Sequence, residues 1–417
     1  MISLSGLLTL LGIPVRALIL AVKFYTVGLP YRKYSNSLKQ CLRLLVFRTA
    51  VSLSVFDAYY ISFMSNDFVI NKIVPLFHKS ITSKLPGYGT RYDKNSFWLV
   101  KQPNREPDDP ILIYIHGGGY FLQTQPDQME SVLSMYKLIK PDKQARLSIL
   151  LLDYKLASYG YPFPTQMNQL HETYSNLVTN EGNTNIILMG DSAGGNLSLG
   201  YLQFLKKTQL ENLVYPSKLV LISPWVKLQP ASDVMVPGNS YYDNSERDMI
   251  AYSQFGDPKK VVHITGEGDL DSLQVCPGAR PTQVENWNDI PTLKDPRFDV
   301  FVITGEDESF RDSILDWCQY ALDVPLNTQY KYGNSNNQFD KEGYEYIRKN
   351  DPGSCHLRLY IEPWGIHDSC LFFENHLISK IKKQESDPKK SSLDVNHIDD
   401  KEFYGITRIV QFLNDTL

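Results

Sequence analysis

A serine with a glycine two residues away on each side is the first candidate for chemistry in this chain. Gly190-Asp191-Ser192-Ala193-Gly194 matches the pattern G-x-S-x-G, which forms the sharp strand-to-helix turn that exposes a nucleophilic serine. The pattern alone is weak, but the apolar stretch 185–190 precedes it and a helix-like stretch rich in small residues follows it. This context predicts that Ser192 is a catalytic nucleophile rather than part of a glycine-rich turn without chemistry.

A second glycine motif, His116-Gly117-Gly118-Gly119-Tyr120, follows the apolar run ILIYI at 111–115. Glycines at the end of a strand can direct bare backbone N–H groups at the negative charge of a tetrahedral intermediate. We therefore expect an oxyanion hole formed by the N–H groups of Gly118, Gly119 and Ala193. The other motif residues, expected to support the two turns rather than to react, are His116, Gly117 and Asp191.

The rest of the chain must supply the elements that hold these motifs. From about residue 86, apolar β-branched runs alternate with helix-like stretches, and the runs expected to be buried strands are 111–115, 147–154, 185–190, 218–225, 299–306 and 356–364. Strands buried on both faces and separated by helices indicate an α/β fold with a mainly parallel central sheet. Two long stretches without this rhythm, 229–295 and 323–355, are expected to be inserted loops, and the polar run 382–400 a solvated loop.

Four segments together carry a family resemblance: HGGGY at 116–120, DYKLASYGYPFPTQ at 153–166, GDSAGGNL at 190–197 and SPWV at 223–226. They resemble the hormone-sensitive-lipase-like (GDXG) lipases and esterases of the α/β-hydrolases, over roughly residues 105–375. The apolar N-terminus and the ISPWVKL segment are most similar to fungal steryl acetyl hydrolases, membrane-anchored relatives of arylacetamide deacetylase that remove acetyl groups from sterols. The resemblance implies an α/β-hydrolase fold with a helical N-terminal cap, and a serine ester hydrolase with a lipophilic ester substrate.

The family pattern also suggests the other two members of a catalytic triad. Its acid precedes an L-R-D tripeptide, and aligning Phe310-Arg311-Asp312 on that tripeptide places the acid at Glu308. Asp307 is the alternative acid, because many members have aspartate there. Either carboxylate would hold the imidazole in its productive tautomer. The base is expected to be His367, since Gly365-Ile366-His367-Asp368 follows the last strand where the family's histidine lies.

The N-terminal 64 residues differ from the body and are expected to be an apolar anchor or cap, with residues 65–417 as the catalytic domain. A first apolar run covers 2–22 and is interrupted by Arg16; a second covers 44–64 and contains Arg48 and Asp57. A membrane span needs about 20 apolar residues, so the first run fits only if the arginine is tolerated. The alternatives are amphipathic helices that lie on a membrane or cap the domain, and a cleaved signal peptide.

Basic residues lie between the two runs, which by the positive-inside rule places this stretch in the cytosol. The body would then be cytosolic if only the first run spans, and lumenal if both do. The resemblance favours the endoplasmic reticulum membrane with a lumenal catalytic domain.

Composition excludes several other functions. The chain has 42 basic and 46 acidic residues and a net charge of −4. This charge provides no positive electrostatic field that would hold a nucleic-acid backbone. Its five cysteines include no C-x-x-C pair, and no metal or cofactor motif is present, so we expect none of either. One disulfide among Cys318, Cys355 and Cys370 is possible in an oxidising compartment. A catalytically silent receptor of the same fold is the alternative from another class, and the sequence makes no prediction of oligomeric state.

Overall fold

The computed structural model describes residues 1–209, 214–266, 268–279, 283–325, 341–387 and 393–417. In this part of the chain, nine strands form one sheet in the order β1-β2-β4-β3-β5-β6-β7-β9-β8. The strands are β1 (Arg91–Asp93), β2 (Ser96–Val100), β3 (Ile111–Ile115), β4 (Ser148–Leu152), β5 (Ile186–Asp191), β6 (Lys218–Ile222), β7 (Asp299–Gly305), β8 (Glu345–Arg348) and β9 (His356–Glu362).

The sheet is mainly parallel, as the sequence predicts. The six central strands from β4 to β9 pair in parallel, whereas β1, β2 and β8 add antiparallel strands at the two edges. Every residue of β3, β4, β5, β6 and β7 is buried, which explains their continuous apolar runs. The three edge strands were not predicted. β1 and β8 have only three and four residues and are partly exposed, whereas β2 is a fully buried strand of five residues that was missed.

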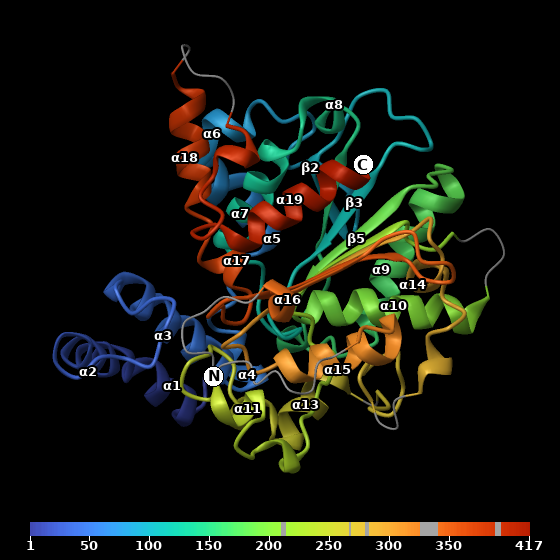
Figure 1. The fold of residues 1–417 in the computed structure, drawn as a ribbon. Helices are drawn as coiled ribbons and strands as arrows, with labels where there is room; N and C mark the ends of the chain where they lie inside the picture. The colour runs from blue at the N-terminus through green and yellow to red at the C-terminus, as the bar shows by residue number, and fades with distance from the viewer. Residues whose placement is uncertain (210–213, 267, 280–282, 326–340, 388–392) are drawn as a thin grey trace.

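Helices cover both faces of the sheet (Figure 1). One face carries α7 (Pro126–Leu138), α17 (Ser369–Phe372), α18 (Leu377–Glu385) and α19 (Tyr404–Thr416). The other face carries α9 (Thr165–Ser175), α10 (Ala193–Thr208), α14 (Pro291–Lys294) and α15 (Arg311–Leu322). The remaining helices outside the N-terminal segment are α5 (Asn66–Phe68), α6 (Val74–Thr82), α8 (Pro141–Gln144), α11 (Ser240–Asp243), α12 (Tyr252–Phe255), α13 (Pro258–Thr265) and α16 (Lys341–Tyr344). Single helical turns of other types are η1 (Val69–Ile73), η2 (Ala157–Tyr159), η3 (Asn176–Asn180), η4 (Ser232–Val234), η5 (Val284–Asn286) and η6 (Val395–His397).

The N-terminal segment forms α1 (Leu4–Leu11), α2 (Ile13–Thr26), α3 (Leu38–Ser52) and α4 (Val55–Ala58), and its first three helices lie together at one corner of the molecule (Figure 1). Among the described residues, Leu4–Thr26 is the one helical stretch long and apolar enough to cross a membrane. The second apolar run behaves differently, because α3 buries Cys41, Leu44 and Thr49 and Arg43 forms an ion pair with Asp127. That run is part of the folded body.

Three further expectations from the sequence can be compared with the structure. The stretch 229–295 is not an irregular loop, since α11 to α14 lie within it. Of the expected insertion 323–355, residues 326–340 lie outside the described residues, as do residues 388–392 of the polar run. All five cysteines are buried free thiols, so the possible disulfide is not formed.

Candidate active site

Ser192 occupies the turn between β5 and α10, with a φ of 49°. The residues two positions before and after it must be glycine because the chain is crowded there. A Cβ at Gly194 would lie 1.8 Å from the carbonyl oxygen of Ile115, and a Cβ at Gly190 would lie 2.3 Å from the carbonyl oxygen of Gly194. The backbone N–H of Ser192 donates to the carbonyl of Ile222 at 3.0 Å. The turn therefore holds the serine at the carboxyl edge of the sheet.

The structure brings Ser192, His367 and Glu308 into one hydrogen-bonded line. His367 Nε2 lies 2.9 Å from Ser192 Oγ, and His367 Nδ1 lies 2.8 Å from Glu308 Oε1. All three are nearly fully buried. They follow β5, β9 and β7, whose carboxyl ends meet at one edge of the sheet. With its proton on Nδ1 directed at Glu308, the imidazole can accept the serine proton at Nε2.

The other oxygen of Glu308 is surrounded by donors. Oε2 accepts hydrogen bonds from Ser223 Oγ, Thr304 Oγ1 and the N–H of Gly305, each at 2.8 Å. These bonds fix the orientation of the carboxylate beside the imidazole.

The alternative acid, Asp307, points away from the imidazole. Its carboxylate binds the guanidinium of Arg32, with Nε at 2.9 Å, and Arg247 Nη1 lies 3.5 Å away. Geometry therefore favours Glu308 over Asp307 as the partner of the histidine.

Groups that the sequence did not indicate hold His367 in place. Asp248 Oδ1 accepts the backbone N–H of His367 at 2.9 Å, and its Oδ2 accepts the N–H of Ser309 at 2.8 Å. The ring of Phe310 packs edge-on against the imidazole at 4.9 Å between centroids. Asp248 lies in the stretch expected to be a loop, and no motif marks it. Only its contact across the fold reveals it.

Asp368 is a second unpredicted member of the site. Its Oδ2 lies 3.1 Å from His367 Nε2, the nitrogen that also faces Ser192, while its Oδ1 is buried without a hydrogen-bond partner among the described residues. Burial opposes the charged imidazole, but the carboxylates of Asp368 and Glu308 outweigh it and raise the pKa of His367 well above its ordinary value. Burial also raises the pKa of Asp368 itself. The one sequence feature that could have indicated Asp368 is its position directly after His367 in the segment G-I-H-D.

The glycine motif turns beside Ser192. Gly118 and Gly119 both have positive φ values, of 104° and 61°, and both line the same cavity as Ser192. The imidazole of His116 stacks on Tyr154 at 4.1 Å, and burial lowers the pKa of His116 to about 4. A neutral, stacked imidazole orders this loop and does not exchange protons near neutral pH.

Asp191 ties the two motifs together, because it lies beside Gly117. A Cβ on Gly117 would come within 2.3 Å of its Oδ2. Tyr114 donates to Asp191 Oδ1 at 2.8 Å and Gln128 Nε2 donates to Oδ2 at 2.9 Å. Burial, together with the carboxylate of Asp368, raises the pKa of Asp191 to about 8.

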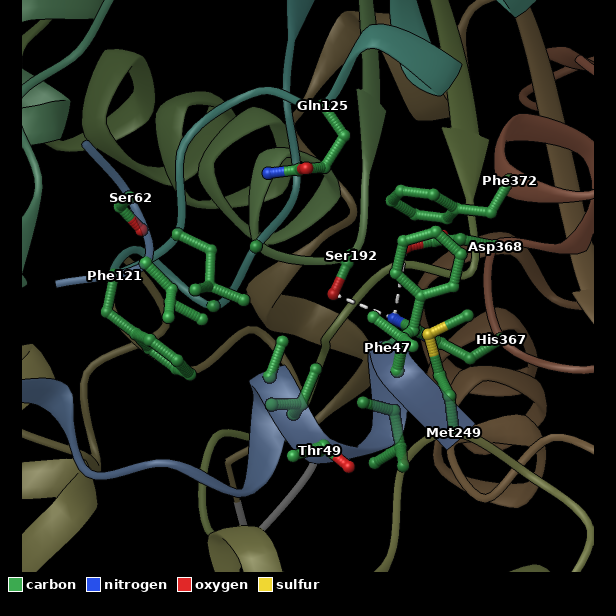
Figure 2. A pocket seen from close by; sticks show the side chains of 18 of the residues that line it. Phe47, Thr49, Ser62, Phe121, Gln125, Ser192, Met249, His367, Asp368 and Phe372 are labelled. Atoms are coloured by element: carbon green, nitrogen blue, oxygen red, sulfur yellow. Dashed lines mark hydrogen bonds and ion pairs between the residues drawn. The ribbon is translucent and has the colours of Figure 1, made fainter. Parts of the chain in front are cut away.

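A cavity of about 320 Å³ opens over Ser192. Figure 2 shows Ser192 and His367 facing into it, with Phe121, Met249 and Phe372 around them. Most of its lining is apolar, and Leu10 and Ile13 of the N-terminal helices are part of it. The site is thus suited to an apolar ligand with one reactive polar centre.

Three other histidines lie away from Ser192. His356 lies 3.3 Å from Asp299, His376 pairs with Glu402, and the ring of His263 packs on Phe56. None of them lines the cavity.

Comparison with known proteins gives consistent results. The family model described as steryl acetyl hydrolase matches residues 72–352. The mug81 protein of Schizosaccharomyces pombe, which carries a provisional steryl acetyl hydrolase name, is 30% identical over 341 residues, covering 76% of this chain and 84% of that protein. Steryl acetyl hydrolase 1 of Saccharomyces cerevisiae is 33% identical over 215 residues, which are 50% of this chain and 47% of that protein.

Among solved structures, an esterase of the bacterial hormone-sensitive lipase family superimposes with a TM-score of 0.52. It is 17% identical, and the match covers 89% of this chain and 96% of that one. At this identity the likeness concerns the fold, which is the α/β-hydrolase fold that the sequence predicts.

Proposed function

This chain belongs to the steryl acetyl hydrolase family and is a carboxylic ester hydrolase. We propose that it removes the acetyl group from sterol acetates or similar lipophilic esters. The catalytic groups in this proposal are Ser192, His367 and Glu308. The observation that carries it is the line of hydrogen bonds from Ser192 through His367 to Glu308, at 2.9 and 2.8 Å, on the floor of an apolar cavity.

The proposed reaction is acyl transfer in two steps. His367 Nε2 takes the proton of Ser192 as Oγ attacks the ester carbonyl, and the carbonyl oxygen becomes an oxyanion bound by the N–H groups of Gly118, Gly119 and Ala193. The intermediate collapses when the imidazolium returns the proton to the departing alcohol, which leaves Ser192 acetylated. Water, deprotonated by His367, then attacks the acetyl carbonyl, and acetate leaves as Ser192 regains its proton.

Glu308 has an electrostatic role in both steps. Its carboxylate stabilises the imidazolium, while the bond to Nδ1 keeps Nε2 free to accept a proton. The three donors on its other oxygen prevent it from turning away.

Family membership supports the acetyl group and the sterol, and the cavity supports a lipophilic alcohol. A cavity of about 320 Å³ is at the small end of the range for ligand sites, so it suits a short acyl group with part of the alcohol. A short-chain esterase for other lipophilic esters is the competing function, and it differs only in the alcohol accepted.

Membrane attachment is part of the proposal, and the family resemblance suggests the endoplasmic reticulum. The apolar helix Leu4–Thr26 supports attachment. A lumenal catalytic domain was expected if both apolar runs span, but α3 holds the second run against the body. Labelling of introduced cysteines from either side of sealed microsomes determines on which side the catalytic domain lies.

The proposed function is tested with the purified full chain in detergent and in vesicles. We expect p-nitrophenyl acetate to be hydrolysed with a higher kcat/KM than the butyrate or octanoate, and cholesteryl acetate to release cholesterol. Faster octanoate turnover would overturn the acetyl assignment. Turnover of p-nitrophenyl acetate without sterol release would assign another alcohol, and a fully active Ser192→Ala variant would refute the site.

A further inference from the structure

We propose that Asp368 is a catalytic residue of the second step, in which its carboxylate binds the attacking water beside His367 and so directs the acetyl group to water instead of to an alcohol. This role rests on the triad of the proposed function, and it applies to any ester that Ser192 cleaves, whatever its alcohol.

The side chain of Asp368 does not do what an aspartate in its position usually does. Asp368 directly precedes the first turn of α17, where an aspartate ordinarily accepts a backbone N–H of the helix. Here the side chain accepts no such hydrogen bond. Asp368 is 2% exposed, and its Oδ1 has no hydrogen-bond partner among the described residues. Burial of a carboxylate without these bonds is unfavourable, so helix capping does not explain the residue.

The backbone at Asp368 is held in a conformation that most residues avoid. Its φ of 51° and ψ of 30° lie in the left-handed region, which aspartate tolerates better than most non-glycine residues. The N–H of Asp368 donates to Ser223 Oγ at 3.1 Å, and Ser223 Oγ donates in turn to Glu308 Oε2 at 2.8 Å. Backbone strain that is held by surrounding contacts is typical of active sites. Asp368 is therefore fixed relative to the acid of the triad.

The carboxylate of Asp368 lies on the reacting side of the imidazole. Its Oδ2 is 3.1 Å from His367 Nε2, the nitrogen that Ser192 Oγ approaches at 2.9 Å, and Figure 2 shows both contacts. Asp368 also lines the cavity over Ser192, whereas Glu308 contacts the opposite nitrogen, Nδ1. The imidazole thus has one carboxylate behind it and a second beside the space where bonds form and break.

After the first step this arrangement needs a hydrogen-bond donor. Ser192 is then acetylated and has no hydroxyl proton, while the imidazole, with its proton on Nδ1, presents a lone pair at Nε2. This lone pair and the carboxylate oxygen of Asp368, 3.1 Å away, are two acceptors, which repel each other in a buried site. One water molecule can donate one hydrogen to Nε2 and the other to Asp368. The two residues together therefore form a binding site for a single water molecule.

Several other polar side chains of the cavity are not placed for this task. Both ends of the Gln128 amide are already engaged in hydrogen bonds, at 2.9 and 2.8 Å. Thr49 donates its hydroxyl to a carbonyl of its own helix. Ser62 lies on the far side of Ser192 from the imidazole (Figure 2). An ordered water in a mostly apolar cavity needs at least two polar partners, and Asp368 supplies the second one beside Nε2.

The proposed step balances without a further reactant. His367 Nε2 takes one proton of the water as the water oxygen bonds to the acetyl carbonyl carbon, and the oxyanion forms on the carbonyl oxygen. The second hydrogen stays on the attacking oxygen and remains hydrogen-bonded to Asp368, which gains no proton. The imidazolium then protonates Ser192 Oγ as the bond from Oγ to the acetyl carbon breaks. Acetic acid leaves and ionises in water.

An alcohol cannot use this site in the same way. Its single O–H hydrogen must go to Nε2, and its carbon chain would then face the carboxylate of Asp368 in place of the second hydrogen. A buried carboxylate that faces a carbon chain without a hydrogen bond is unfavourable. Asp368 therefore favours release of the acetyl group to water over its transfer to an alcohol, including the alcohol that has just left.

The role is tested by stopped-flow hydrolysis of p-nitrophenyl acetate with the purified full chain. The first release of p-nitrophenolate reports acetylation of Ser192, and the later steady rate reports deacetylation. The variant is Asp368→Gly, because glycine adopts the positive φ of this position without strain. Asp323→Gly is the matched control, since Asp323 also has a positive φ, of 54°, but its half-exposed carboxylate pairs with Lys294 away from the cavity.

We expect Asp368→Gly to keep the acetylation rate within about threefold and to lower the deacetylation rate at least about tenfold. This appears as a burst of one p-nitrophenolate per active site followed by slow turnover, whereas Asp323→Gly should match the unchanged chain in both rates. A change in the basicity of His367 alone would alter both steps together, since Nε2 removes a proton in each. Equal losses in the two rates, or an unchanged deacetylation rate, would overturn the role of Asp368.

A second measurement does not depend on the amount of folded enzyme. With methanol added at a fixed concentration, the ratio of methyl acetate to acetate reports how acetylated Ser192 divides between the two nucleophiles. We expect this ratio to rise at least about fivefold in Asp368→Gly, and an unchanged ratio would overturn the proposal. If the unchanged chain releases no p-nitrophenolate, or if Ser192→Ala still does, the triad itself fails, and the role of Asp368 fails with it.

Discussion

Replacement of Glu308 separates the proposed triad acid from its neighbour more sharply than any other change. Glu308→Gln preserves the shape of the side chain and removes its charge. The N–H of Gly305 donates to Oε2 at 2.8 Å and cannot reverse its direction. The glutamine carbonyl must therefore occupy that position, which turns the amide NH₂ toward Nδ1 of His367.

The consequence is a change of tautomer. An NH₂ group facing Nδ1 makes that nitrogen an acceptor, so the imidazole carries its proton on Nε2, which faces Ser192 Oγ at 2.9 Å. An Nε2–H cannot take the serine proton. Loss of the correct tautomer in a serine triad lowers kcat by about 10,000-fold, which at 1.36 kcal/mol per tenfold is about 5 kcal/mol of barrier.

The matched control is Asp307→Asn, an equivalent change at the next residue. Its carboxylate binds Arg32 rather than the histidine, and Arg32 keeps Glu306 as a partner at 3.2 Å. We expect a far smaller loss of kcat than in Glu308→Gln, because the imidazole keeps its carboxylate partner at 2.8 Å.

The assay is p-nitrophenyl acetate hydrolysis by purified variants with near-ultraviolet circular dichroism to verify folding. A larger loss in Asp307→Asn than in Glu308→Gln would show that the acid is misassigned. Near-normal turnover in folded Glu308→Gln would refute the tautomer argument itself.

Three other substitutions give distinct outcomes. Ser192→Ala should lower kcat by about a millionfold and leave the thermal midpoint unchanged in calorimetry; residual turnover above a thousandth would contradict it. Asp368→Asn removes the nearest charge from Nε2 and so lowers the pKa of His367, which should move the acidic limb of the kcat/KM profile to lower pH; a limb that stays in place would show that Asp368 is already neutral in the active enzyme. Gly194→Ala places a Cβ 1.8 Å from the carbonyl oxygen of Ile115 and should cost about 3 kcal/mol or more of stability, measured by denaturant unfolding; an unchanged midpoint would mean that the turn tolerates a shift.

The sequence predicted the central strands and the nucleophile turn because both depend on local patterns. A buried parallel strand must be apolar throughout, and a tight turn between β5 and α10 must be glycine on both sides of the serine, so composition and spacing indicate them directly. The edge strand β8 shows no such pattern. Its four residues, Glu345–Arg348, are mostly polar or partly exposed, so nothing in the sequence marks them as part of the sheet.

The choice between Glu308 and Asp307 shows a different limit. Both carboxylates follow β7, and their local sequences do not differ in any way that fixes direction. Direction comes from partners far away in the chain, namely Ser223 for Glu308 and Arg32 for Asp307. Asp248 and Asp368 were missed for the same reason, because their function depends on contacts with His367 and not on a motif.

These distant contacts also explain why the apolar N-terminus belongs with the catalytic machinery. Arg32 pairs with the residue directly before Glu308, and Lys33 reaches Ser369, two residues after His367. The segment that follows the apolar helix thus holds both loops that position the triad. The second apolar run, which reads as a poor membrane span, supplies α3 and with it one wall of the cavity. A stretch that looks like an independent anchor in the sequence is therefore structurally continuous with the active site, and the acid that the histidine does not use has a structural task in joining the two.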